Sequence, residues 1–276
     1  MEIQSRKQLQ QAWAWRKEDE KSIFSDLKEQ KSLLEALGFA DVTAIPRIIS
    51  FVGGGGKTTS MYHLAEELAE QGLRVLVTTT THIQYPNDGQ TADIIHVSEL
   101  DEITWEGKIL TAGKSVLSVL DNGRQMKKLT MPEGLGDEAV MARLLELADV
   151  ILIEADGAKC KPLKVPRDGE PVLIPQTGLV IACAGLSSIG CTFEEVCFRF
   201  AEYGAWLRRS AEEPVEPEDL SLILMDERGS RKGLDGRYYR IILNQADGSE
   251  YLEMARRVIC ALPVTLQPGC AVTFYQ

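Results

Sequence analysis

The chain has 276 residues and a formal net charge of −11, with 44% hydrophobic and 26% charged residues. This composition is ordinary for a globular protein, and the length allows one large α/β domain or a domain with an appendage. The acidic balance argues against a nucleic-acid-binding surface, which needs a basic face. The polar start lacks the apolar region of a signal peptide, and no window approaches the ~20 apolar residues of a membrane span, so we expect a cytoplasmic protein without a nucleic-acid or membrane partner.

Residues 1–38 are rich in Gln, Lys, Glu, Leu and Ala, contain no Pro and end at Gly38. This pattern predicts a helical N-terminal extension. We place the main domain, an α/β domain, at residues 39–276. The role of residues 1–31 is left open.

The main domain begins with a strand, a glycine run, a helix and a second strand. Residues 47–52 form a short apolar run that leads directly into four glycines. A helical stretch over 57–71 ends at Gly72, and 74–79 reads as a second strand. This order predicts one βαβ unit with a right-handed crossover and a parallel sheet.

The rest of the chain continues the alternation of strands and helices. Residues 92–120 predict a strand and a small antiparallel insert, and 148–154 is the most apolar strand, expected to be buried on both faces. Further strands are predicted near 179–184 and 238–243, with helices at 137–147, 193–209 and 249–261. The fold class is therefore a three-layer α/β domain of the P-loop NTPase type, with a mostly parallel sheet.

The glycine run has the composition of a phosphate-binding loop. Glycines let consecutive N–H groups converge on a polyphosphate, and the following helix adds partial positive charge. Lys57 would reach the β- and γ-phosphates, and the Thr58 hydroxyl would bind Mg²⁺. The candidate phosphate-binding residues are Gly53, Gly54, Gly55, Gly56, Lys57, Thr58, Thr59 and, further along the chain, Gly157.

The loop departs from the general pattern G-x-x-x-x-G-K-[ST], because Phe51 stands at its first glycine position. The run resembles the variant loop K-G-G-x-G-K-T-T of the nitrogenase iron protein and the MinD/ParA group. Val52 replaces the first lysine of that variant, which crosses a dimer to the partner's nucleotide. The oligomeric state is therefore left open.

Two acids follow the most apolar strand. Glu154 and Asp156 precede Gly157, and acid-x-x-Gly resembles the switch motif of GTPases, in its Glu form that of the nickel-insertion GTPases. Either acid could hold Mg²⁺ with Thr58 and complete a catalytic set with Lys57. A solvated acidic turn is the structural alternative.

Other side chains near these elements are candidates for a switch or for substrate contact. Thr80, Thr81 and His82 end the second strand, at the edge where α/β sheets bind ligands. Lys159 and Lys164 follow the acids and could neutralise a phosphate or an anionic substrate. Purely structural roles are the alternative for all five.

Cys160 occupies the place of a metal-binding Cys-Pro pair in the nickel proteins, but Lys161 intervenes, so metal binding there stays open. The six cysteines form no CxxC pair and fit small core residues of a reducing compartment.

A base-reading motif is suggested late in the chain. Asn244-Gln245-Ala246-Asp247 resembles N-K-x-D of GTPases, in which the Asp accepts two hydrogen bonds from guanine. Asn244 and Asp247 are therefore the candidate base-binding residues. Gln245 replaces the stacking lysine, so GTP is only slightly favoured over ATP, and Asp247 as a helix N-cap is the alternative.

Together, these pieces resemble the YqeC family, accessory proteins of selenium-dependent molybdenum hydroxylases. The most specific part is the succession E-A-D-G-A-K, P-L-K-x-P and E-P-V-x-I-P over residues 154–175, and the resemblance covers roughly 32–276. It implies a P-loop protein whose partner is a molybdenum hydroxylase or one of its maturation proteins.

Three functions fit these observations. The first is a Mg²⁺-dependent nucleoside triphosphatase, using ATP or GTP, whose hydrolysis switches contacts with a partner. The second is a kinase that phosphorylates a small anionic cofactor or metabolite. The third is an adaptor that senses a nucleotide without hydrolysing it.

Overall fold

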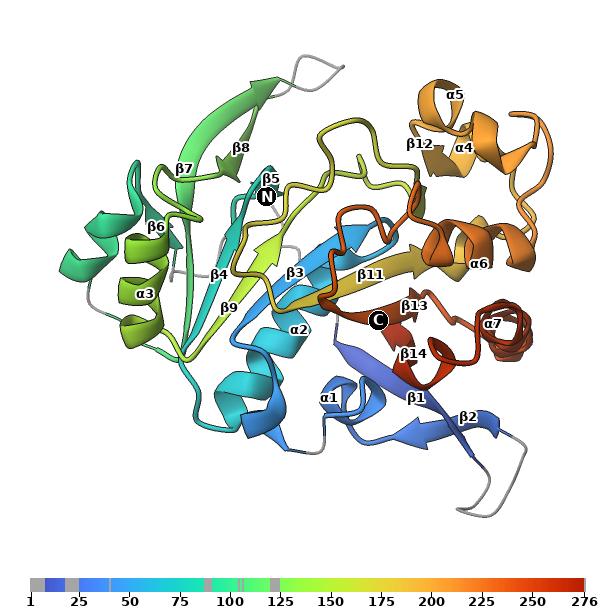
Figure 1. The fold of residues 1–276 in the computed structure, drawn as a ribbon, viewed down its shortest axis with the longest axis horizontal. Helices are drawn as coiled ribbons and strands as arrows, with labels where there is room; N and C mark the ends of the chain where they lie inside the picture. The colour runs from blue at the N-terminus through green and yellow to red at the C-terminus, as the bar shows by residue number, and fades with distance from the viewer. Residues whose placement is uncertain are drawn as a thin grey trace.

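The computed structural model describes residues 8–17, 25–39, 41–86, 91–103, 105, 107–119 and 125–275, and a large sheet runs through them (Figure 1). The strands of this sheet are β1 (Leu9–Lys17), β2 (Ser25–Gln30), β3 (Ile48–Gly53), β4 (Val75–Thr79), β5 (His82–Gln84), β6 (Thr91–Asp93), β7 (Ile109–Val119), β8 (Gln125–Thr130), β9 (Val150–Glu154), β11 (Leu179–Gly185), β13 (Tyr238–Asn244) and β14 (Cys270–Tyr275). Their order is β2-β1-β14-β13-β11-β3-β9-β4-β7-β8-β5, with β6 beside β7. Two further short strands, β10 (Leu163–Lys164) and β12 (Cys197–Phe198), pair with each other.

From β14 to β7, every neighbouring pair of strands is parallel, whereas β1, β2, β8 and β5 run antiparallel to their neighbours. Parallel strands bring their carboxyl ends to one edge of the sheet. Glu154 at the end of β9 is in register with Thr79 of β4 and with Phe51 of β3. The glycine loop and Glu154 are therefore neighbours in space, as a shared binding site would require.

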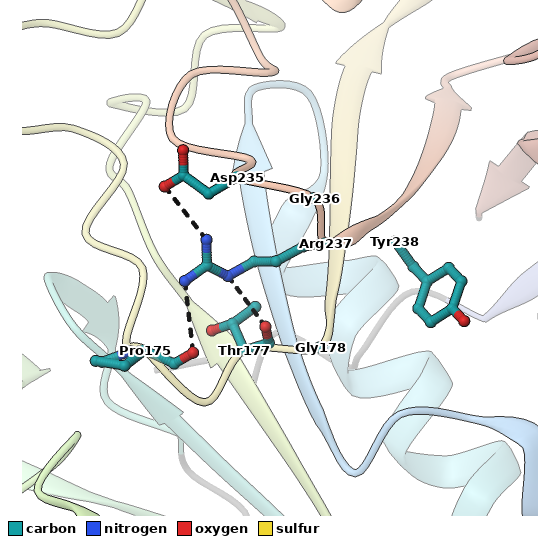
Figure 2. A pocket seen from close by; sticks show the side chains of 7 residues that line it. All are labelled: Pro175, Thr177, Gly178, Asp235, Gly236, Arg237 and Tyr238. Carbon is teal, nitrogen blue, oxygen red and sulfur yellow. Dashed lines mark hydrogen bonds and ion pairs between the residues drawn. The ribbon is translucent and has the colours of Figure 1, made fainter.

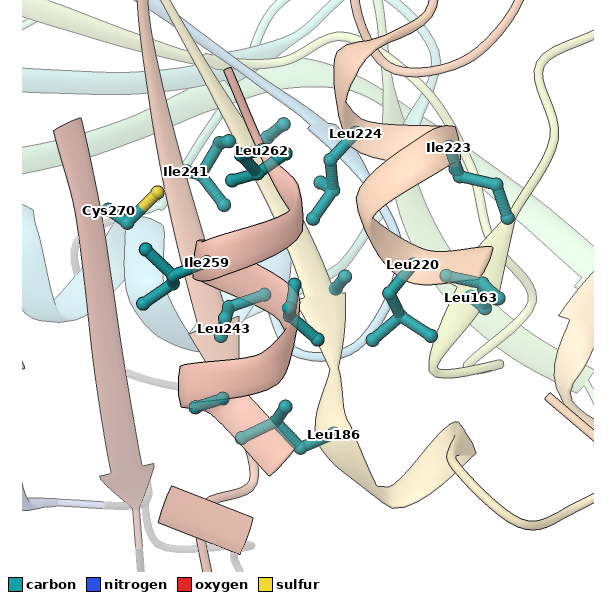
Figure 3. Packing of buried hydrophobic residues seen from close by; sticks show 14 of the residues in the cluster. Leu163, Leu186, Leu220, Ile223, Leu224, Ile241, Leu243, Ile259, Leu262 and Cys270 are labelled. Atoms are coloured by element: carbon teal, nitrogen blue, oxygen red, sulfur yellow. The ribbon is translucent and has the colours of Figure 1, made fainter. Parts of the chain in front are cut away.

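Helices cover both faces of the sheet and make three layers. α1 (Leu33–Ala36) and α2 (Lys57–Glu70) pack on one face, and α3 (Glu138–Leu147), α6 (Pro217–Met225) and α7 (Ser249–Ala261) pack on the other. Figure 3 shows the second face, where leucines and isoleucines of α6 and α7 meet side chains of β13. The α/β class with a mostly parallel sheet is thus confirmed.

The prediction of a helical extension over residues 1–38 is wrong. The described part of this segment forms β1 and β2, followed only by the four-residue α1. In β1, Ala12 and Ala14 point into the core beside α2, while Trp13 and Trp15 point into the core beside α7. Because both faces of β1 are buried, the sequence shows no alternation of apolar and polar residues. Pairing with β14 overrides the helix propensity of its residues.

The single helix predicted over 193–209 is also wrong. The segment is divided into α4 (Phe193–Val196), β12, α5 (Phe200–Tyr203) and a 3₁₀ turn at Ala205–Leu207. Arg199 and Arg208 have positive φ angles of 65° and 56°, which interrupt a right-handed helix. The break lets β12 pair with β10 in the segment that follows the acids.

Most other predicted elements are confirmed, including the helices over 57–71 and 249–261 and the antiparallel insert, in which β7 is one long strand. Among the described residues, no helix combines the length and the apolar character that a membrane crossing requires.

Candidate functional site

The glycine loop joins β3 to α2 at the carboxyl edge of the sheet (Figure 1). Gly56 is the N-cap of α2 and adopts a left-handed conformation, with φ 100° and ψ 19°, which glycine tolerates best. Within the described residues, the N–H groups of Gly56, Lys57, Thr58 and Thr59 donate to no protein acceptor. These four donors stand at the positive end of a 14-residue helix, which is the arrangement that binds a phosphate.

The preceding part of the loop is bonded within the protein. Gly54 N–H donates to the carbonyl of Cys183 at 2.9 Å, and Gly55 N–H donates to the carbonyl of Lys161 at 3.1 Å. A Cβ atom at Gly54 would lie 2.8 Å from the Lys161 oxygen, and one at Gly55 would lie 2.7 Å from the Pro162 oxygen. The segment after β9 therefore covers these glycines closely, and only residues without side chains fit beneath it.

Lys57 lies inside the loop, with 5% of its surface exposed. Its Nζ donates to the Gly53 carbonyl at 2.6 Å and is 3.2 Å from Asp156 Oδ1. Burial alone would lower the pKa of this ammonium group, but the carboxylates of Asp156 and Glu154 outweigh burial and raise the pKa above its usual value. Lys57 is therefore a fixed positive charge next to the free amides.

Glu154 and Thr58 meet at the end of β9. The Thr58 hydroxyl donates to Glu154 Oε2 at 2.6 Å, and the carboxylate is buried. Burial raises the pKa of Glu154, opposed by Lys57 and by the Thr58 hydrogen bond. A hydroxyl and a carboxylate oxygen side by side are hard oxygen ligands of the kind Mg²⁺ prefers, so this pair fits the predicted metal.

Asp156, the competing metal acid, makes different contacts. Its Oδ2 accepts the Gly53 N–H at 3.0 Å and lies 3.1 Å from Lys164 Nζ, while Oδ1 faces Lys57. The carboxylate is thus shared between two ammonium groups and a backbone amide. Of the two acids, Glu154 is the one that contacts the candidate Mg²⁺ hydroxyl.

The threonines at the end of β4 do not contact the glycine loop. Thr79 Oγ1 donates to the Glu154 carbonyl at 2.8 Å and accepts from Thr81 N–H, and the Thr80 hydroxyl donates to the Val172 carbonyl at 2.7 Å. His82 is exposed in β5, opposite Thr130 of β8. The Thr80 N–H also donates to the Glu154 carbonyl, at 3.1 Å, so both Thr79 and Thr80 contact the end of the strand that carries the acid.

The candidate substrate lysines are in contrasting places. Lys159 is exposed and adopts φ 46°, next to the exposed, free Cys160 at φ 61°. Lys164 is buried between carboxylates. Gly157 is half-buried, and a Cβ atom there would meet nothing within 4 Å. Of these residues, Lys159 and Cys160 are the ones whose side chains face solvent.

Asn244 contacts the glycine loop directly. Its Nδ2 donates to the Gly55 carbonyl at 2.6 Å and to Ser60 Oγ at 3.2 Å, and the side chain is buried. Asp247, three residues later, is exposed, while Gln245 Oε1 accepts the Ser187 hydroxyl at 2.6 Å. Asn244 therefore holds the loop. No pattern in the sequence pointed to Ser60, because a serine inside a helix is common.

A surface pocket lies at the opposite edge of the sheet, at the amino end of β13 (Figure 2). Arg237 fills its wall and donates to the backbone carbonyls of Thr177 at 3.0 Å and Gly233 at 3.1 Å, with Asp235 3.5 Å away. Because its guanidinium already donates to these acceptors, Arg237 holds the loop at Thr177 to the loop at Gly233. No predicted site residue lines this pocket.

The fold and the site define an α/β protein with a phosphate-binding type of glycine loop between β3 and α2. Comparison with known proteins gives the family. The family model described as "YqeC protein" matches residues 49–201, and the uncharacterized protein YqeC of Escherichia coli (strain K12) is 32% identical over 191 residues, which cover 68% of this chain and 72% of that protein. The chain belongs to the YqeC family. In shape it is similar to a chain of the MinC:MinD cell division protein complex of Aquifex aeolicus, with 14% identity, a TM-score of 0.40 and coverage of 78% and 77% of the two chains.

Proposed function

We propose that this protein binds a nucleoside triphosphate with Mg²⁺ at the amino end of α2 and hydrolyses it slowly. The observation that carries the proposal is the group of four free N–H donors from Gly56 to Thr59, beside the buried ammonium of Lys57. Phosphate oxygens would replace the Gly53 carbonyl and Asp156 as the partners of Lys57. Mg²⁺ would be held by Thr58 and Glu154, which already touch, and would neutralise charge that develops on the phosphates.

Full engagement of the phosphates requires a change in the loop. A polyphosphate tail that follows the glycines needs the Gly55 N–H, which Lys161 holds in this structure. We therefore propose that residues 159–162 form a lid that leaves the glycines when nucleotide binds. Lys159 and Cys160 of the lid are exposed, and its displacement would break the hydrogen bonds from Gly55 N–H to Lys161 and from Gly185 N–H to the Pro162 carbonyl.

Base recognition is proposed to involve the turn after β13. Asn244 fixes the turn to the glycine loop, and Asp247 is exposed beyond it, where a guanine base could reach its carboxylate. Calorimetry with GTP and ATP analogues in the presence of Mg²⁺, repeated on Asp247→Ala, tests this role. A GTP preference that survives the substitution assigns base selection to other residues.

The central test is Lys57→Ala, which removes the ammonium group and leaves the free amides in place. We expect the loss of detectable nucleotide binding and hydrolysis in a protein that keeps the circular dichroism spectrum of the wild type. Lys31→Ala is the control, because Lys31 is an exposed lysine outside the candidate site. Equal nucleotide affinity in Lys57→Ala and wild type would contradict the site assignment.

The same assays separate the three candidate activities. Phosphate release without an acceptor supports a triphosphatase, and turnover that needs an added anionic acceptor supports a kinase. Binding without any release supports an adaptor. The structure favours the first over the second, because Lys164 is buried and Lys161 donates to the Glu194 carbonyl, which leaves Lys159 as the exposed lysine of the three.

We further propose a molybdenum hydroxylase, or a protein of its maturation, as the partner in the cytoplasm. This step is supported by the family resemblance and not by a contact in the structure. Co-purification of a tagged chain with a molybdenum hydroxylase, in the presence and absence of a nucleotide analogue, tests it. Absence of any such enzyme from both samples would count against this partner.

A further inference from the structure

A line of buried charges runs from the glycine loop into the protein. Asp156 contacts Lys57 on one side and Lys164 on the other, and Lys164 Nζ lies 2.7 Å from Glu170 Oε2. The side chain of Lys164 has no exposed surface, and those of Asp156 and Glu170 are 3% and 7% exposed. Four alternating charges are therefore held away from water next to the candidate phosphate site.

Burying these charges costs folding free energy, because each charge loses its hydration and needs a charged or hydrogen-bonded partner. Asp156 has two ammonium partners in this structure, and the proposed nucleotide would draw Lys57 toward its phosphates. Lys164 would then be the ammonium group that remains beside Asp156 and keeps its carboxylate in place. Held there, Asp156 keeps accepting the Gly53 N–H, which fixes the start of the glycine loop.

Glu170 supports Lys164 from the far side. Its Oε1 accepts from Arg167 Nε at 3.1 Å and lies 3.7 Å from Arg199, so the carboxylate is held in place at both oxygens. The segment that carries it is tied to the sheet by the hydrogen bond from Val172 N–H to the Ala155 carbonyl, at 2.9 Å. Glu170 is therefore fixed to the end of β9, the strand that ends at Glu154.

We propose that Lys164 and Glu170 are positioning residues of the nucleotide site, which hold the Asp156 carboxylate in place against the Gly53 N–H. Neither residue contacts the nucleotide. The catalytic part of this inference rests on the proposed triphosphatase function, whereas the positioning of Gly53 exists without a ligand. The row of charges from Glu170 through Lys164 to Asp156 would matter for the rate of hydrolysis more than for nucleotide affinity.

The test uses Glu170→Gln, with Asp168→Asn as the matched control, since Asp168 is a nearby carboxylate that is 97% exposed. We expect kcat for nucleotide hydrolysis to fall about tenfold in Glu170→Gln, while Kd stays within about threefold. A loss of this size is typical when a residue that only orients another site residue is removed. The control should match the wild type. Because Glu170 acts through Lys164, Glu170→Gln should add little further loss in a Lys164→Met background.

A second measurement does not depend on hydrolysis. In the nucleotide-free protein, the Gly53 amide should exchange its hydrogen about tenfold faster in Glu170→Gln than in wild type, as expected when one charged hydrogen bond weakens. Unchanged Gly53 exchange in a folded Glu170→Gln overturns the positioning role. If the exchange changes but the wild type binds no nucleotide, the proposed function fails and the positioning role stands.

Discussion

Residues 159 and 160 provide a way to test whether the lid opposes nucleotide binding. Both adopt the left-handed backbone region without being glycine, with φ 46° and 61°, and Lys161 next to them holds the Gly55 N–H. Cys160 is exposed and free, so a substitution there changes no core contact. Cys160→Gly relieves the backbone strain of the closed lid, and Cys160→Ala keeps that strain.

The expected magnitude follows from the two backbone terms. A left-handed residue with a Cβ atom destabilises the closed lid by about 1–2 kcal/mol, whereas the greater backbone freedom of glycine stabilises the open lid by about 0.5–1 kcal/mol. In Cys160→Gly, the closed lid should therefore become more stable relative to the open lid by about 1 kcal/mol. If binding needs an open lid, the nucleotide Kd should rise about fivefold.

Calorimetric titration of a non-hydrolysable nucleotide with Mg²⁺ measures this change. Cys160→Ala should bind like the wild type, because it removes the thiol and leaves the backbone strain. The opposite substitution, Cys160→Pro, cannot adopt a positive φ, so it should open the lid and tighten binding. Equal affinities in the Gly and Ala variants would show that nucleotide binding does not require movement of this segment.

Three further predictions concern the metal, the glycine loop and the N-terminal strand. Because burial raises the pKa of Glu154, protons should compete with Mg²⁺ at a higher pH than for an exposed glutamate. As the pH is lowered, Mg²⁺ affinity measured by calorimetry should therefore start to fall at a higher pH than an exposed glutamate would give, and Glu154→Gln should lose this pH dependence. Asn244→Ala removes the donor to the Gly55 carbonyl and should lower the free energy of unfolding in urea by about 1–3 kcal/mol, with weaker nucleotide binding. Trp13→Ala should lower the free energy of unfolding by about 3–5 kcal/mol in the same measurement. Leu117→Ala, at a side chain that is 71% exposed, should lower it by less than about 0.5 kcal/mol. Equal losses in the two variants would refute the packing of the N-terminal strand.

The sequence predicted which residues come together in the candidate site, because the signals for them are local. The apolar strand before the glycines, Lys57 and Thr58 at the helix start, and Glu154 at the end of a second buried strand are all readable from short windows. Parallel pairing then brings the ends of β3 and β9 together without further information.

The parts that escaped prediction depend on contacts between distant segments. β1 looks helical in composition, but it pairs with β2 on one side and with β14, more than 250 residues later in the chain, on the other. The lid over Gly55 and the contact between Lys164 and Glu170 depend on how loops fold back, which no periodicity encodes. The role of Lys164 in particular depends on its burial, because a solvated lysine and a buried one look alike in a sequence.

The pairing of β1 with β14 has a consequence for the order in which the protein assembles. The hydrogen bond from Arg16 to the Pro268 carbonyl joins residues that are 252 positions apart in the sequence. β1 therefore leaves the ribosome long before β14 has been synthesised. Until then, a strand with two buried tryptophans has no neighbour on that side. Such late, long-range pairing slows folding and leaves an edge open to aggregation, so newly made chains should depend on chaperones until synthesis reaches the final strand.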